Sequence, residues 1–286
     1  MKCLYFLLLI AYVPVCASKA PPLVGNPSLS LIVYEAKTES NSSAGSSGSS
    51  SSKSAIVERY IGEKDGVLEL EYSFPGANIS ENDAWKFPAR VLNKPGSSIK
   101  LLNQSEIKVR LESYLEKYPK IRKQCGGVVF TWTAFPIHCD VNHVIDVIER
   151  YNLRLGALSE GKLYKESDAI MSAPLRAIST YSSTLIYEVE LILEPDILIS
   201  TYKKDMEQVA AITGGNVRSI ISSSLRLIGE GKPEFSGKRL VTIEMASNGQ
   251  VAKLKRETIT VIKGGDSYQE TRKVIETLER RPFDTY

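Results

Sequence analysis

Two tight-turn signals inside strand-like runs constrain the fold of this chain more than any other feature. Asp65-Gly66 lies inside the run 56–74, and Asn248-Gly249 lies inside the run 239–262. Asp-Gly and Asn-Gly favour the two-residue turns that join neighbouring antiparallel strands. Apolar and polar residues alternate over 68–73, so one face of that strand is expected to be dry and the other wet. The sequence therefore predicts two antiparallel hairpins.

Other segments show the spacing of amphipathic helices. In the clearest one, apolar residues recur every three to four positions from Ile107 to Tyr118, and Asn103 with Glu106 matches a reciprocal N-terminal cap. Strands and helices do not alternate as a doubly wound parallel sheet would require. We therefore expect the α+β class, with one or more antiparallel sheets and packed helices. The expected helices span residues 104–118, 141–148, 195–213 and 217–228.

The sequence leaves the structure of two segments open. Residues 29–34 have strand composition, and they either join the main sheet as an edge strand or form a tether. Residues 267–281 suit a helix by their apolar spacing, whereas their threonines and the preceding turn suit a third antiparallel strand. We favour the strand for this tail.

A low-complexity Ser/Gly tract at residues 40–54 divides the chain. It has almost no apolar surface to bury, so it predicts a flexible, disordered linker. A short N-terminal segment, residues 18–39, precedes it. The folded body that follows is long enough for one or two α+β subdomains, residues 55–158 and residues 159–286, of which the second ends in an antiparallel hairpin or meander.

The first 17 residues have the three parts of a cleavable signal peptide. Lys2 supplies the positive charge, an apolar core follows it, and the short side chains of Val15 and Ala17 form the cleavage site. The apolar core is too short to span a bilayer, and no later segment is long and apolar enough to do so. We therefore expect cleavage before Ser18 and a periplasmic or secreted protein without a transmembrane segment.

The cysteines separate into a signal-peptide pair and a pair in the mature chain. Cys16 raises the alternative of a lipid anchor, but that processing favours small residues just before the cysteine, and Pro14 and Val15 stand there instead. A lipid anchor is therefore not expected. Cys125 and Cys139 remain after cleavage, and two cysteines in an oxidising compartment most simply form a disulfide. Closing a loop of this length stabilises a fold by about 3 kcal/mol.

The charge balance argues against a nucleic-acid partner. The chain carries a net charge of +3, and removal of Lys2 lowers it to +2. A nucleic-acid-binding face would need a strong excess of basic side chains. The partner is instead expected to be an unknown protein or a component of the cell envelope.

His138, Asp140 and His143 form the cluster with the best claim to chemistry. Both histidines of the chain lie there, beside Cys139, and zinc accepts His, Cys and Asp ligands. The competing interpretation is structural: Cys139 is disulfide-bonded, Asp140 caps a helix, and His143 lies on an exposed first turn. His138 and His143 are five residues apart across a strand–helix junction, and this spacing does not bring two ligands onto one helical face as a metal site requires. We therefore expect no metal and no other cofactor.

Other functional patterns in the sequence have ordinary explanations. The S-x-x-K motif of penicillin-recognising enzymes occurs at residues 97–100 and 159–162, but the accompanying S-D-N and K-T-G elements are missing. Five aromatic residues could form a stacking platform for a sugar or a peptide, although aromatic residues beside strands usually belong to the core. These are Trp85, Phe87, Phe130, Trp132 and Phe135.

A loose spacing of aromatic, cysteine and proline positions covers most of residues 55–150. It consists of Trp85-Lys86-Phe87-Pro88, Leu101-Leu102-Asn103, Cys125-Gly126, Phe130-Thr131-Trp132 and Cys139-Asp140. This spacing resembles a pattern in exported, uncharacterised proteins of Gram-negative bacteria, which implies a periplasmic or cell-surface address and no particular activity. Residues 241–245 with Asn248-Gly249 also resemble the TonB C-terminal domain, a resemblance that requires a helical tail.

These observations favour an exported protein that binds a partner or supports the envelope without a catalytic centre. General acid–base chemistry near neutral pH most often uses histidine, and both histidines lie beside a cysteine expected to be bonded. The alternative is a hydrolase or metal-dependent enzyme that uses the His138–His143 region.

Overall fold

A computed structural model describes residues 29–76, 81–130, 134–178, 184–213, 233–264 and 268–283. The signal peptide expected at 1–17, the cleavage site before Ser18 and the helix expected at 217–228 lie outside these ranges. No helix of the described residues is both long and apolar enough to cross a membrane.

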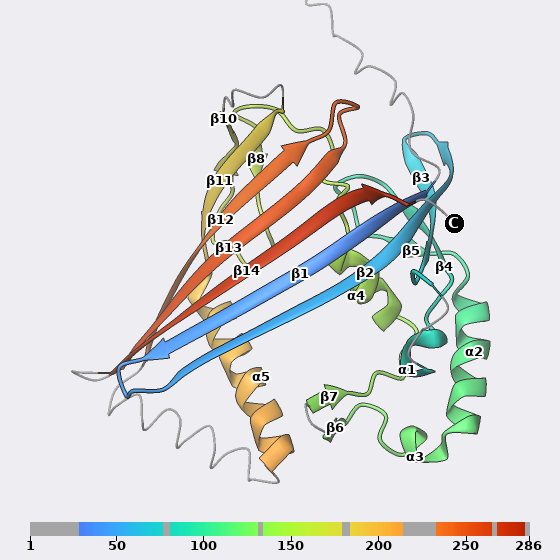
Figure 1. Cartoon of the computed structure of the whole chain (residues 1–286), viewed down its shortest axis with the longest axis horizontal. Helices are drawn as coiled ribbons and strands as arrows, with labels where there is room; N and C mark the ends of the chain where they lie inside the picture. The colour runs from blue at the N-terminus through green and yellow to red at the C-terminus, as the bar shows by residue number, and fades with distance from the viewer. Residues whose placement is uncertain are drawn as a thin grey trace, which may run out of the picture.

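One large antiparallel sheet dominates the molecule (Figure 1). It has ten strands in the order β10-β11-β12-β13-β14-β1-β2-β3-β4-β5. About half of the structure is strand and about a fifth is helix. The strands are β1 (Leu29–Ser42), β2 (Ser47–Lys64), β3 (Val67–Ser73), β4 (Ala89–Asn93), β5 (Lys100–Leu101), β10 (Arg176–Ile178), β11 (Ile186–Ile192), β12 (Glu234–Met245), β13 (Val251–Gly264) and β14 (Tyr268–Pro282).

The expected α+β class is therefore wrong, because the fold is dominated by its sheet. Most of the local elements were predicted in the right places, but strands from both sides of the expected boundary at residue 158 join a single sheet. Local patterns mark where strands lie and do not specify how distant strands pair. The remaining strands form two small pairs, β6 (Val128–Phe130) with β7 (Ala134–Pro136) and β8 (Leu163–Tyr164) with β9 (Ala173–Pro174).

The first and last described strands lie side by side in the middle of the sheet. β1 pairs with β14 from Ser30–Pro282 to Ser42–Glu270. The blue and dark red ribbons of Figure 1 show this pairing. Residues 29–34 thus belong to a central strand, neither an edge strand nor a tether. The tail is a strand, as expected, so the helix that the TonB-like interpretation requires is absent from the described part of the tail.

The Ser/Gly tract differs from the linker that its composition predicts. Residues 40–42 end β1, and Ser47–Ser54 begin β2, which pairs with β1 along the whole of this stretch. Serine and glycine have low strand propensity, but hydrogen bonding to a neighbouring strand overrides such a preference. The two strands extend as one long hairpin, whose tip lies at the left of Figure 1.

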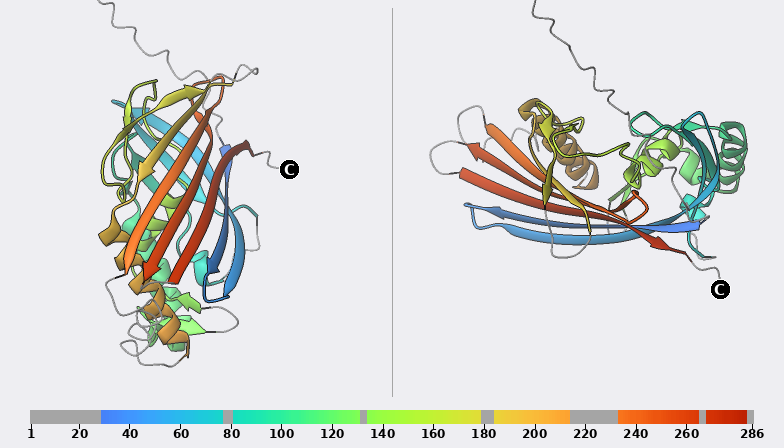
Figure 2. Two further views of the ribbon diagram at one scale, coloured as in Figure 1. Left: turned by 90° about the vertical axis from the view of Figure 1, so that its left-hand side faces the viewer. Right: turned by 90° about the horizontal axis from the view of Figure 1, so that it is seen from above.

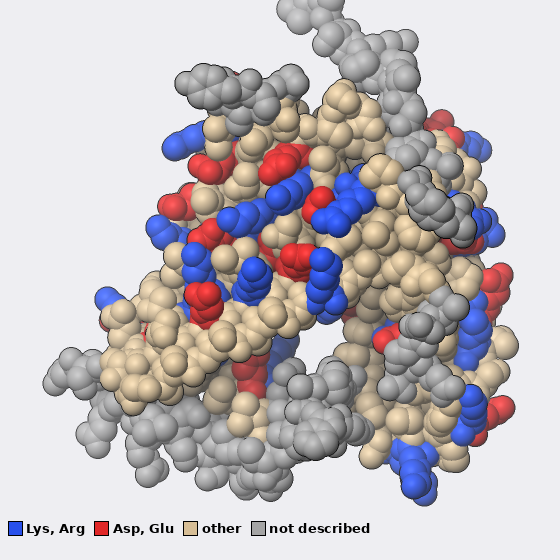
Figure 3. Space-filling model, viewed as in Figure 1, with Lys and Arg blue, Asp and Glu red and all other residues tan. Residues whose placement is uncertain are grey.

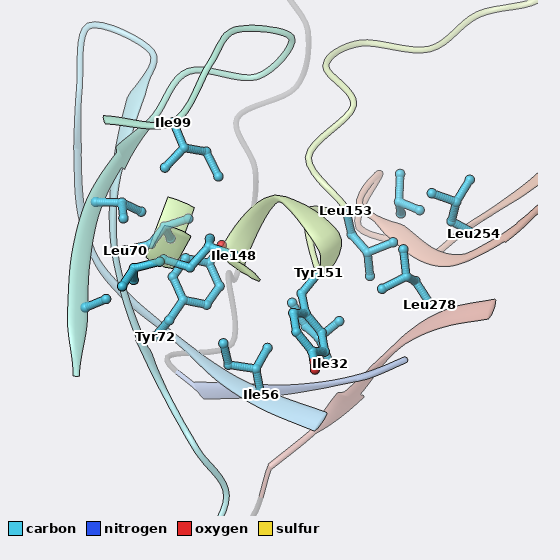
Figure 4. Close-up of a cluster of buried hydrophobic side chains, with 14 of the residues drawn as sticks. Ile32, Ile56, Leu70, Tyr72, Ile99, Ile148, Tyr151, Leu153, Leu254 and Leu278 are labelled. Carbon is cyan, nitrogen blue, oxygen red and sulfur yellow. The ribbon is translucent and has the colours of Figure 1, made fainter. Parts of the chain in front are cut away.

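The helices lie on one side of the curved sheet. They are α1 (Glu81–Ala84), α2 (Gln104–Lys117), α3 (Pro119–Arg122), α4 (His143–Arg150) and α5 (Pro195–Thr213). Figure 2 shows α4 and α5 on the same side, which we call the inner face. There α4 buries Val144 and Ile148. Ile148 lies beside Leu70 and Tyr72, and Tyr151 lies beside Ile32 (Figure 4).

The opposite, outer face is exposed and carries alternating charges. Lys53 pairs with Glu35 at 2.5 Å, and Lys273 pairs with Glu257 at 2.6 Å. Figure 3 shows these acidic and basic side chains interspersed over the central strands. The outer side is therefore largely charged, while the inner side combines buried apolar residues with a few charged ones.

The turn predictions are confirmed. Asp65 and Gly66 both have positive φ angles, 53° and 74°, and they join β2 to β3. Gly249, at φ 77°, lies in the turn between β12 and β13. Asn-Gly and Asp-Gly suit these turns because glycine, and to a lesser degree Asp and Asn, tolerate the left-handed region.

The predicted reciprocal cap of α2 is wrong, although the helix is there. Asn103 makes no side-chain cap. Its Oδ1 accepts the backbone N–H of Arg90 at 2.9 Å, and its Nδ2 donates to the Pro88 carbonyl at 3.2 Å and to Glu106 at 3.1 Å. The side chain thus ties the start of α2 to β4, because a buried amide needs partners for both its ends.

Candidate binding cleft

A cleft of about 670 Å³ lies between the inner face of β12–β14 and the segment 152–168. Leu155, Leu158 and Leu175 line part of it. Most of the other residues of its wall are polar or charged. Because the sheet supplies one side and an irregular segment the other, the positions of these charges depend on the contacts that hold the segment to the sheet.

Arg239 of β12 makes the strongest of these contacts. Its Nη1 and Nη2 donate to the two carboxylate oxygens of Asp168 at 2.9 and 2.8 Å, and Nη1 also pairs with Glu166. Its Nε donates to the hydroxyl of Thr258, its register partner on β13, at 2.9 Å. Two-pronged arginine–carboxylate pairing fixes both distance and orientation. Arg239 is therefore immobilised at the wall of the cleft.

Arg256 of β13 completes what we call the cleft cluster: Arg239, Arg256, Glu166, Asp168 and Tyr164. Its Nε lies 2.6 Å from Glu166, whose same oxygen accepts the Tyr164 hydroxyl at 2.8 Å. Burial alone would raise the pKa of Glu166, but the neighbouring arginines outweigh it and lower the pKa below its ordinary value. Glu166 is thus ionised at neutral pH.

A second group of charges, the Glu58 cluster, lies deeper. Glu58 accepts from Arg154 at 2.7 Å and from Arg280 at 2.6 Å, and its other oxygen accepts the Tyr72 hydroxyl at 2.8 Å. The Glu58 side chain is 2% exposed. Burial raises its pKa, but the charges of Arg280 and Arg154 overcome this effect and lower the pKa to about 2.

Arg154 connects the two clusters. Its side chain binds Glu58 and also lines the cleft. The Nε atoms of Arg154 and Arg280 are buried without a hydrogen-bond partner in the described structure. The segment 152–168 is therefore held at one end by Glu58 of β2 and at the other by Arg239 and Arg256.

The predicted histidine cluster forms a different arrangement away from the cleft. The rings of His138 and His143 stack with centroids 3.6 Å apart and an angle of 14° between their planes. Burial lowers the pKa of both rings, and their mutual repulsion and Lys86 lower it further at His143. Both are neutral at pH 7. Asp146 lies 3.5 Å from His143.

Asp140, the third predicted site residue, turns to the backbone instead. Its carboxylate accepts the N–H of Asn142 at 2.9 Å, just before α4. Within the described ranges, no group of three His, Cys, Asp or Glu side chains is arranged to hold a metal ion. The two histidines are close together in the sequence, but no sequence pattern indicates that their rings stack.

The predicted disulfide is confirmed: Cys125 and Cys139 are bonded. Of the predicted aromatic group, Trp85 and Phe87 are buried in the core. Phe130 lies in β6 and Phe135 in β7, while Trp132 lies outside the described residues. Of the two S-x-x-K motifs, Ser97 of the first and Lys162 of the second both line the cleft.

The charged residues of the two clusters are not among the site residues predicted from the sequence. Arg239 alternates with Val241 and Ile243 on β12, and Glu58 alternates with Ile56 on β2, so each charged residue occupies an apolar-side position. A charge at such a position is rare unless a partner balances it. This mismatch in the alternation was the available signal.

No family model and no curated protein matches this chain. Among solved structures, one similar chain comes from a structure titled "Lipid-protein interactions in lipovitellin", with 8% sequence identity and a TM-score of 0.40. The alignment covers 91% of this chain and 26% of that one. The chain thus spans about a quarter of that protein's length, and a similarity this low assigns neither a family nor a function.

Proposed function

We propose that this protein is an exported, non-enzymatic binding protein that holds a small ligand in the cleft between the sheet and segment 152–168. The observation that carries the proposal is the fixed pair of arginines at the cleft wall. Arg239 and Arg256 are held by carboxylates of the facing segment before any ligand arrives. Groups held in place in this way lose little conformational entropy on binding.

The size and lining of the cleft support the same proposal. Ligand sites usually occupy about 300–1,000 Å³ and combine apolar walls with a few fixed polar groups. This cleft has that volume, with leucines on one part of its wall and the cleft cluster on another. The ligand it suits is a small molecule with an apolar body and hydrogen-bond acceptors directed at Arg239 and Arg256.

Binding fits the cleft better than catalysis does. Covalent catalysis needs a nucleophile beside a base, and neither His138 nor His143 lines the cleft. Four of the charged groups that line it, Arg239, Arg256, Glu166 and Asp168, already neutralise one another in ion pairs. The hydrolase alternative would have to operate at the stacked histidines, where neither ring faces the cleft cavity.

A ligand screen by thermal shift, followed by calorimetry of the hits, tests the proposal. Ser97→Trp should fill the cleft without breaking an ion pair, and Arg256→Gln should remove one fixed donor. Each change should weaken binding of a confirmed ligand by about tenfold or more, or about 1.4 kcal/mol. Arg281→Gln is the matched control, because Arg281 is an exposed arginine of the outer face that pairs with Glu279.

The results separate the cleft from other sites. Loss of affinity in Ser97→Trp and Arg256→Gln, with wild-type affinity in the control, would support the cleft. Unchanged affinity in a folded Ser97→Trp protein would place the ligand elsewhere and reject the proposal. Export has its own test: the mature protein should begin at Ser18, and an N-terminal peptide containing Met1 would contradict this.

A further inference from the structure

The distal half of β2 has a free edge. Ser47–Ser54 pair with β1 on one side, whereas the pairing of β2 with β3 begins only at Val57–Ser73. In the described chain, no strand pairs with the other side of residues 47–54. Figure 3 shows an opening beside this lower edge of the sheet. Alternate residues of an antiparallel strand direct their N–H and C=O groups to the same side, so this edge presents a row of unused backbone groups.

Among the residues that the structure describes, the usual protection of a strand edge is missing from this stretch. Natural edges of this length are commonly blocked by lysine, proline, a bulge or a covering element. The one charged residue here, Lys53, is ion-paired to Glu35 on the neighbouring strand of its own sheet. The other residues of 47–54 are serine and glycine, and all of them are exposed. The edge is therefore hydrophilic and still open to strand addition.

We infer that the β2 edges of two copies of this chain pair with each other, antiparallel, to join their sheets. Antiparallel pairing of one segment with itself is compatible with two-fold symmetry, the commonest arrangement of soluble homo-oligomers. With the two-fold axis at Ser50, opposite residues keep their side chains on the same face, and Lys53 lies opposite Ser47 of the partner, so no like charges face each other. All the remaining positions place serine or glycine opposite serine or glycine.

The composition of the edge selects a second copy over an unrelated strand. Strand addition obtains its affinity from main-chain hydrogen bonds and its selectivity from pockets for side chains. Ser47–Ser54 form no such pockets, so large side chains on a partner would gain no contacts here. The chain's own Ser/Gly segment fits without steric or charge conflict.

The interface is small, so the dimer should be weak and reversible. A single pair of eight-residue strands buries less than the roughly 1,200 Å² of a standard stable interface. We therefore expect association at about 100 μM protein and monomers at about 1 μM. Sedimentation velocity over this concentration range measures the equilibrium directly.

A charged edge tests the assignment. In Ser49→Lys/Ser51→Lys, both new lysines lie on the outer side of β2 with Lys53, so three ammonium groups line the edge. Dimerisation should weaken by tenfold or more. The matched control is Ser236→Lys/Ser247→Lys, which adds the same charge at two exposed serines away from β2 and should dimerise like the wild type.

Hydrogen exchange supplies a second measurement. Amide protons of residues 47–54 should exchange more slowly at high protein concentration than at low concentration, in the wild type and in the control. A protein that is monomeric over the whole range overturns the inference. So does a dimer that persists unchanged in the edge variant, or slowing of exchange at 47–54 only when a different protein is added.

Discussion

The two charged clusters consist of the same kinds of side chain in different surroundings. Glu58 lies between two arginines and a tyrosine hydroxyl, and so does Glu166. The Glu58 side chain is 2% exposed and inside the core, whereas that of Glu166 is 12% exposed beside the cleft. The same set of groups thus holds core strands together where it is buried, and it forms the wall of the proposed ligand site where it borders a cavity.

The difference also lies in how the charges balance. The Glu58 cluster has two guanidinium groups for one carboxylate, and both oxygens of Glu58 depend on buried internal donors. The cleft cluster has a second carboxylate, Asp168, which takes both terminal nitrogens of Arg239. Water in the cleft can replace a lost partner there, so the deep cluster should be far less tolerant of change.

Removing the central carboxylate, Glu58 or Glu166, should give the largest difference in stability loss between the two clusters. Glu58→Ala should lower the free energy of unfolding by about 3–5 kcal/mol, because two buried arginines lose their counter-ion. Glu166→Ala should cost about 1–2 kcal/mol, because Arg239 keeps Asp168 and water reaches the site. Urea unfolding followed by circular dichroism measures both values.

If Glu58→Ala does not fold, Glu58→Gln keeps the shape and one hydrogen-bond acceptor and should still cost more than Glu166→Gln. Equal losses at the two sites would show that burial does not distinguish the clusters.

The second-largest effect should be a loss of stability at acidic pH that comes from the Glu58 cluster. The pKa of Glu58 falls from 4.5 to about 2 on folding, so its ionisation stabilises the native state at pH values above 4.5. This contribution, about 3 kcal/mol at most, should be lost as the pH falls from 4.5 toward 2. Unfolding free energies measured across this window should lose part of their pH dependence in Glu58→Gln. A variant with the same pH dependence as the wild type would contradict the assignment.

Removing a tyrosine hydroxyl should give the smallest difference in stability loss between the two clusters. Tyr72→Phe leaves one oxygen of the buried Glu58 without its donor and should cost about 1–3 kcal/mol. Tyr164→Phe removes the equivalent donor from Glu166, which has access to water, and should cost less than about 1 kcal/mol. Thermal unfolding of the two variants side by side provides the measurement, and a larger loss at Tyr164 would reverse the proposed order.

The sequence was a good guide to local structure and a poor one to assembly. Asp65-Gly66 and Asn248-Gly249 predicted their turns because those turns require left-handed backbone angles. The disulfide followed from the number of cysteines and from the expected oxidising compartment. The Ser/Gly tract failed as a prediction because its strand conformation comes from pairing with β1, and no property of the tract itself reports that partner.

The candidate site could not be predicted from the sequence for the same reason. Glu166 and Arg256 are 90 residues apart, and Glu58 and Arg280 are 222 apart, so only the folded sheet brings them together. A charge on the apolar side of a strand indicates that some partner exists. It does not say which one, because local alternation carries no information about the strand order.

The central pairing of β1 with β14 has a consequence for biosynthesis. Tyr34 meets Glu276, 242 residues further along the chain. At about 5–20 residues per second, synthesis of the chain between them takes roughly 10–50 s. During that time β1 is complete but lacks one of its two neighbours. A chain truncated before Tyr268 would leave both β1 and β13 with unpaired edges in the middle of the sheet, so premature termination should produce aggregating products instead of a smaller folded protein.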